Sequence, residues 1–124
     1  MSPAELKTKR EALGLSQQWL ANRVGVRIRT IQRWEAGDQT PPNDVQDEIL
    51  KVEMLKKNEV SRILVKARTQ KETPTLLFRY KTEEELWIHS PTFHSLPVTT
   101  YALVVLEAKK RIEKEALKCD IDYF

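Results

Sequence analysis

Three glycines, Gly14, Gly25 and Gly37, divide the first 37 residues of the chain into three short segments. Glycine adopts the left-handed backbone conformation at little cost and therefore often ends a helix. Ser2, followed by a proline, and Ser16 are typical N-caps at the start of the first two segments. The sequence thus predicts short helices from about residue 3 to 13, over 17–24 and from 27 or 28 to 36, with tight turns between them.

The third predicted helix has two different faces. At about 100° per residue, Ile31 and Trp34 share one face and are expected to anchor the helix, while Arg29 and Arg33 lie on the opposite side. Two short helices joined by a glycine turn, the second rich in arginine, form a helix-turn-helix pattern. The outward face offers side chains that suit the DNA major groove, in which arginine pairs with guanine, glutamine with adenine, and an apolar group with the thymine methyl. These are Arg29, Gln32 and Arg33, with Ile28 at the N-terminal end.

Residues 13–37, LGLSQQWLANRVGVRIRTIQRWEAG, resemble the DNA-binding core of the Cro/cI (XRE-type) helix-turn-helix family. The resemblance extends over roughly residues 3–68. Two positions depart from the family pattern, since Arg27 replaces a small N-capping residue and Trp19 replaces a polar one. The matching positions are Leu15, Ser16, Gln17, Leu20, Ala21, Gly25, Val26, Ile31, Glu35 and Gly37.

The resemblance implies roles for individual residues. The base-reading positions would be Ile28, Arg29, Gln32 and Arg33. The positions in contact with DNA phosphates would be Gln17, Arg27, Thr30, Gly37 and Asp38, with Arg27 as an addition of this chain at the helix entrance. Arg10 and Glu35 occupy the places of a structural ion pair.

The remainder of the chain is predicted to be mixed. Residues 44–68 have helical periodicity that slips near Lys57-Asn58, which leaves one long helix or two. A polar linker at 69–75 precedes a strand at 76–80, a short helix from Thr82, a loop at 90–99 in which a second strand is an alternative, and a helix at 100–118. The predicted fold class is mainly α, with a five-helix helix-turn-helix domain at 1–69 and a small α+β dimerisation or interaction segment at 70–124.

Charge is unevenly distributed along the chain, although the net charge is only +3. Residues 1–40 hold seven basic and four acidic residues, whereas residues 72–124 hold seven and nine, so the basic character lies where nucleic acid is expected to bind. The single cysteine, Cys119, and the absence of a long apolar run favour a cytoplasmic protein. His89, His94 and Cys119 are too irregularly spaced for a metal site. We expect no cofactor, no metal and no enzymatic activity.

One recognition helix reads too few base pairs to select a site in a genome, so proteins of this fold usually bind inverted repeats as dimers. The apolar residues of the C-terminal half exceed what it can bury alone, and this half weakly resembles the dimerising tail of small phage repressors, including those encoded beside anti-CRISPR genes. We therefore expect a homodimeric repressor that binds double-stranded DNA. Repressors of this kind often regulate their own operon. Two alternatives are an antitoxin whose residues 74–124 bind a toxin, and an RNA-binding regulator, which the narrow major groove of RNA disfavours.

Overall fold

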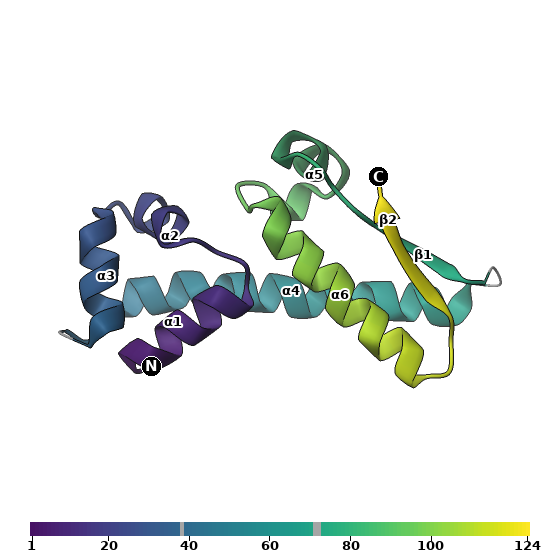
Figure 1. Ribbon diagram of the computed structural model, residues 1–124, viewed down its shortest axis with the longest axis horizontal. Helices are drawn as coiled ribbons and strands as arrows, with labels where there is room; N and C mark the ends of the chain where they lie inside the picture. Colours follow the sequence, from purple (N-terminus) through teal and green to yellow (C-terminus); the bar gives the residue numbers. More distant parts are fainter. Residues whose placement is uncertain (38, 71–72) are drawn as a thin grey trace. The chain divides into compact units, whose positions relative to one another are not determined.

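The structure, a computed structural model, describes residues 1–37, 39–70 and 73–124 (Figure 1). It confirms the predicted fold class, because the chain is mainly helical with a small two-stranded sheet near its C-terminal end. The elements are α1 (Pro3–Ala12), α2 (Gln17–Val24), α3 (Ile28–Ala36), α4 (Asn43–Thr69), β1 (Thr75–Arg79), α5 (Glu83–His89), the 3-10 turn η1 (Pro91–Phe93), α6 (Val98–Lys114) and β2 (Cys119–Tyr123).

The chain packs as two compact units, Met1–Glu53 and Met54–Phe124, and α4 contributes to both. The functional division at residues 69 and 70 that the sequence suggests stays a prediction. None of the helices in the described ranges has the length and apolar content needed to cross a membrane.

Local signals set the helix ends of the first unit. The Ser2 hydroxyl accepts a hydrogen bond from the Glu5 amide at 3.1 Å, and the Ser16 hydroxyl accepts one from the Trp19 amide at 2.9 Å. Such caps satisfy amides at the helix start that have no partner within the helix. At the other ends of α2 and α3, Gly25 and Gly37 have φ of 74° and 94°, in the left-handed region that favours glycine.

The core of the first unit lies between α1, α2, α3 and the first half of α4. Leu6, Leu20 and Ile31 come from the three short helices, Ile49 comes from α4, and all four side chains are fully buried. In the amphipathic α3, burial of Ile31 and Trp34 leaves the opposite face exposed. The core therefore determines which side of α3 meets solvent.

The stretch that the sequence left open as one helix or two is a single continuous helix, α4. The fifth helix expected in this region is its C-terminal part. Val45 and Ile49 are buried within the first unit, whereas Val60 and Ile63 are buried within the second. The apolar period slips near Lys57-Asn58 because the two halves of the helix cover different cores, and the backbone continues through the slip.

The second unit is built on a parallel pair of strands. Its register runs from Thr75 opposite Cys119 to Arg79 opposite Tyr123. Parallel strands need a long crossover, and α5, η1 and α6 supply it. The alternative of a second strand within residues 90–99 is wrong, since η1 and the start of α6 occupy that stretch and the partner strand is β2.

A buried carboxylate connects α4 to α6 inside the second unit. Glu59 accepts two hydrogen bonds from Arg62, at 2.6 and 3.0 Å, and one from the Tyr101 hydroxyl at 2.9 Å. Burial acts to raise the pKa of Glu59, but these hydrogen bonds outweigh it and lower the pKa. Burial and the neighbouring carboxylate together raise the pKa of Tyr101. Glu59 is therefore charged and fully paired.

Candidate nucleic-acid interface

The outward face of α3 is polar and exposed. Arg29, Gln32 and Arg33 are exposed, and the Ile28 side chain at the helix start is 37% exposed. Ile31 and Trp34, at 0% and 6% exposure, hold the helix from the other side. The local reason is the helical period, which places residues 29, 32 and 33 on the side away from residue 31. The four residues predicted to read bases thus share one accessible surface.

The arginines on and beside α3 lack acidic partners among the residues that the structure describes. Arg27, Arg29 and Arg33 form no ion pair within these ranges. Most other arginines do pair with a glutamate, namely Arg10, Arg23, Arg62, Arg68 and Arg111. A local concentration of uncompensated positive charge on one helix favours a polyanionic ligand.

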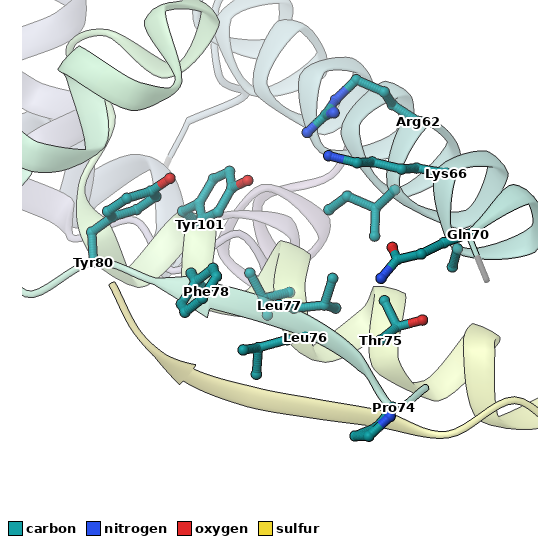
Figure 2. A pocket seen from close by; sticks show the side chains of 13 residues that line it. Arg62, Lys66, Gln70, Pro74, Thr75, Leu76, Leu77, Phe78, Tyr80 and Tyr101 are labelled. Carbon is teal, nitrogen blue, oxygen red and sulfur yellow. The ribbon is translucent and has the colours of Figure 1, made fainter. Parts of the chain in front are cut away.

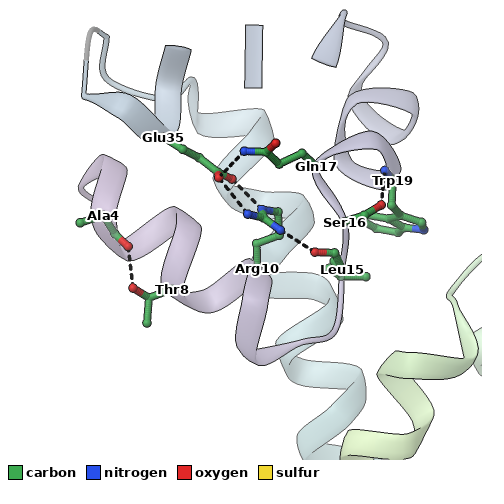
Figure 3. Close-up of polar contacts among 8 residues, drawn as sticks. All are labelled: Ala4, Thr8, Arg10, Leu15, Ser16, Gln17, Trp19 and Glu35. Carbon is green, nitrogen blue, oxygen red and sulfur yellow. Dashed lines mark hydrogen bonds and ion pairs between the residues drawn. The ribbon is translucent and has the colours of Figure 1, made fainter. Parts of the chain in front are cut away.

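Behind α3 lies a buried network that joins the three short helices (Figure 3). Arg10 on α1 donates two hydrogen bonds to the Glu35 carboxylate, at 2.6 Å from Nε and 2.9 Å from Nη2. The side chains are 8% and 3% exposed. A third bond runs from Arg10 Nη1 to the Leu15 carbonyl at 2.7 Å, in the turn before α2.

Gln17, the first residue of α2, extends this network. Its amide nitrogen donates to Glu35 Oε1 at 3.0 Å. Burial acts to raise the pKa of Glu35, but the bonds from Arg10 and Gln17 outweigh burial and lower it. An amide nitrogen carries two N–H donors. The bond to Glu35 uses one of them and fixes the side chain, so the second donor is available at the start of α2.

Comparison with known protein families matches residues 6–52 to a helix-turn-helix family model. This range begins in α1 and ends within α4, and it contains the whole arrangement just described. Residues 6–52 belong to the helix-turn-helix family. This match supports the Cro/cI (XRE-type) pattern of residues 13–37 and a DNA-binding transcriptional regulator of that type. The comparison with curated proteins found no match.

Within the helix-turn-helix domain, the N-terminal end of α3 has no side-chain cap. Arg27 stands at the N-cap position, and its side chain makes no capping hydrogen bond. Its carbonyl instead accepts from the Thr30 amide at 2.9 Å. Unsatisfied amides at a helix start attract anions. Arg27 and the partly exposed Thr30 lie at this end of the helix.

The turn after α3 in the helix-turn-helix domain begins at Gly37. Its amide donates to the carbonyls of Arg33 and Trp34 and so completes the helix end. Among the described residues apart from its chain neighbours, no atom lies within 4 Å of the place where a Cβ would be. Gly37 is therefore suited to close approach by a DNA backbone through its lack of a side chain, whereas its N–H is already engaged. Asp38 lies outside the described residues.

Two features of the helix-turn-helix domain were not predicted from the sequence. The first is the bond from Gln17 to Glu35, for which the sequence offers no local signal because 18 residues separate the partners. The second is the environment of Trp19, which has the Arg23 guanidinium 5.5 Å from its ring centre. Arg23 also donates to Glu48 on α4 at 3.0 Å. The spacing of four residues between Trp19 and Arg23 on one helix is the signal that was available for this contact.

Proposed function

We propose that the protein is a sequence-specific, homodimeric transcriptional repressor that binds an inverted-repeat operator and excludes RNA polymerase from a promoter. The observation that carries the proposal is the exposed face of α3, on which Arg29, Gln32 and Arg33 stand together without acidic partners in the described ranges. Within a helix-turn-helix domain, this is the helix that enters the major groove.

In this proposal the side chains on the outer face of α3 have distinct tasks. Arg29 and Arg33 each suit a guanine through two hydrogen bonds, Gln32 suits an adenine, and the partly exposed Ile28 suits a thymine methyl. These contacts discriminate between bases. Contacts with phosphates set the position of the domain on the duplex without reading sequence.

Phosphate contacts are assigned to residues around the base-reading face, namely Gln17, Arg27, Thr30, Gly37 and Asp38. The argument is strongest for Gln17, whose position is fixed by the bond to Glu35 while one N–H donor is left over. A side chain held before binding loses less conformational freedom when the complex forms. The Arg10–Glu35 pair is proposed to act through this positioning and to touch no DNA itself.

Apolar surface on the second unit supports the dimer. Several large apolar side chains remain between 39% and 66% exposed, among them Phe78, Ile88, Leu106, Tyr123 and Phe124. Exposed apolar surface of this kind is typical of an interface. Because the second unit has its own buried core, including Leu86, Phe93 and Val104, it is better suited to a folded dimerisation module than to a segment that folds only around a toxin.

A binding-site selection tests whether the outer face of α3 reads bases. The full-length protein is expected to enrich a symmetric motif from random duplex DNA, and footprinting upstream of its own gene is expected to protect a site about two helical turns long. Arg33→Ala should relax preference at one position in each half-site, at a cost of about 1–3 kcal/mol. The matched control is Arg111→Ala, which removes an exposed arginine of the second unit and should leave the motif unchanged.

The outcome that contradicts the base-reading role is equally specific. If Arg33→Ala selects the same motif with the same affinity as the unaltered protein, Arg33 does not read a base. Gln17→Ala is expected to weaken binding to all sequences alike, and selective loss at one position would contradict its assignment to a phosphate. Competition by RNA hairpins at equal concentration with duplex DNA would favour the RNA-binding alternative.

A further inference from the structure

The two strands of the second unit have unequal outer edges. The Thr75 amide donates to the Lys118 carbonyl at 2.8 Å, so Thr75 faces β2. Alternate residues of a strand in a parallel ladder bond to the same neighbour. The backbone N–H and C=O groups of Leu76 and Phe78 therefore point away from β2, and no other strand of the described chain lies beside them. Strand β1 is an edge strand with unused hydrogen-bonding groups.

The outer edge of β2 carries features that block pairing. Lys109 of α6 donates a hydrogen bond to the Cys119 carbonyl and so occupies an acceptor on this edge. Asp120 and Asp122 are exposed and place two negative charges on the five-residue strand. Charged side chains and occupied backbone groups are the usual protection of edge strands against further pairing. Among the described residues, no side chain occupies the outward backbone groups of Leu76 and Phe78, and the one charged residue of β1, Arg79, lies over the Tyr123 ring of β2.

The solvent face of the sheet is divided in the same way. Leu76 lies opposite Asp120 and Phe78 lies opposite Asp122, and all four residues are exposed. The apolar residues thus lie on β1 and the acidic residues on β2. A sheet that ended at β1 would have its apolar strand at the edge, whereas a sheet extended beyond β1 would have an apolar centre with acidic outer strands.

A groove runs along the free edge of β1 (Figure 2). Its volume is about 540 Å³, and it is lined by the consecutive residues 74–78 on one side and by Arg62, Lys66 and Gln70 of α4 on the other. Consecutive strand residues point to opposite faces of a sheet. Because all five line the groove, it follows the edge of the strand and leaves space beside its backbone.

We propose that β1 of a second copy of this chain pairs antiparallel with β1 along this groove and forms a continuous four-stranded sheet in the order β2-β1-β1-β2. This inference rests on the proposed homodimer and specifies its interface. A two-fold axis makes the two copies of one strand antiparallel and offers each the same row of groups, so an unprotected edge complements itself. Leu76 and Phe78 of both copies then lie side by side in the centre, and the acidic strands lie outside.

The register follows from the length of the strand. With the two-fold axis at Leu77, the midpoint of β1, all five residues of one strand pair with all five of the other. Leu76 then pairs with Phe78 of the second copy through both backbone groups. Leu77 lies opposite Leu77 of the second copy. The two residues form a pair without hydrogen bonds between them, in which the Cα atoms are about 4.5 Å apart. This distance permits a disulfide between cysteines at that position.

A pair of proline substitutions separates this edge from the other. Leu76→Pro removes an N–H that points into the groove and breaks no hydrogen bond between β1 and β2. Ile121→Pro is the matched control because it removes an N–H from the outer edge of β2. In sedimentation equilibrium of the full-length chain, the unaltered protein and Ile121→Pro are expected to be dimers. Leu76→Pro is expected to dimerise at least about tenfold more weakly, with an unchanged circular dichroism spectrum.

A cross-linking experiment tests the same interface without a proline. In a Cys119→Ala background, Leu77→Cys is expected to form an intermolecular disulfide under mild oxidation, whereas Ile121→Cys is expected to stay monomeric on a denaturing gel. A dimer that persists unchanged in Leu76→Pro, together with no cross-link at position 77, overturns the β1 interface while the homodimer stands. A chain that is monomeric at all concentrations overturns the homodimer as well.

Discussion

Replacement of Arg10 by methionine is the perturbation with the clearest expected effect on the DNA-binding domain. Methionine is close to arginine in length and keeps apolar packing, but it lacks all three hydrogen bonds that Arg10 makes. The Glu35 carboxylate would stay 3% exposed in the folded domain, with Gln17 as its remaining side-chain donor among the described residues. Arg10→Met therefore leaves a buried charge without its cation.

The size of the expected loss in unfolding free energy follows from the burial and the hydrogen bonds of the Arg10–Glu35 pair. Removal of one partner from a buried ion pair costs about 3–5 kcal/mol because the other charge stays buried and uncompensated. Two charge-assisted bonds at 2.6 and 2.9 Å, each with a net contribution of about 1.5–3 kcal/mol, give about 3–6 kcal/mol, which overlaps with this range. Lys9→Met is the matched control on the same helix. Lys9 pairs with Glu53 at 3.2 Å near the surface, and its loss should cost less than about 1 kcal/mol.

The effect should depend on pH in a definite direction. In the unaltered protein the pKa of Glu35 is lowered by folding, so its contribution to stability is present above the unfolded pKa and is lost as pH falls through the folded value. Without Arg10, we expect burial to raise the pKa of Glu35 in the folded state above its unfolded value. Protonation of Glu35 then reduces the destabilisation of the variant. The difference in unfolding free energy between the two proteins should be largest near neutral pH and shrink towards pH 4.

The assay is urea denaturation of the full-length protein, combined with amide hydrogen exchange of α1, α2 and α3, which reports on the first unit by itself. The double variant Arg10→Met/Glu35→Leu should be more stable than Arg10→Met alone, because it no longer buries an unpaired charge. The reasoning is refuted if Arg10→Met costs no more than Lys9→Met at neutral pH, or if its effect grows on acidification.

Three further substitutions have effects that follow from single contacts. Gly37→Ala should destabilise the first unit by about 1–2 kcal/mol, because φ is 94° while the space for a Cβ is open; thermal unfolding measures the loss. Ser16→Ala should cost about 1 kcal/mol by removing the cap of α2, with faster amide exchange at Trp19 as the readout. Tyr101→Phe should destabilise the second unit by about 1–3 kcal/mol, because the buried Glu59 loses one of its donors; urea denaturation checks this, and exchange in α1 to α3 should stay unchanged.

The sequence by itself determined the short helices and the DNA-binding family. Ser2, Ser16 and Thr82 cap helices through contacts three residues away, and Gly25 and Gly37 end helices through their own backbone conformation. These interactions are local, so they can be recognised in a linear pattern. The division of α3 into a buried and an exposed face is also local, because it depends only on the helical period.

Only the tertiary structure decided the partner of β1. The segment CDIDY follows the helix predicted at 100–118 and is not assigned to any element from the sequence, yet it forms β2, because a long crossover returns the chain to β1 in parallel register. The tertiary structure likewise decided that Gln17 donates to Glu35 and that α4 runs unbroken past Lys57-Asn58. In each case the partners are distant in the chain, and their pairing depends on how packed elements are placed. Sequence periodicity does not encode that placement, and the unprotected edge of β1 is visible only once the placement is known.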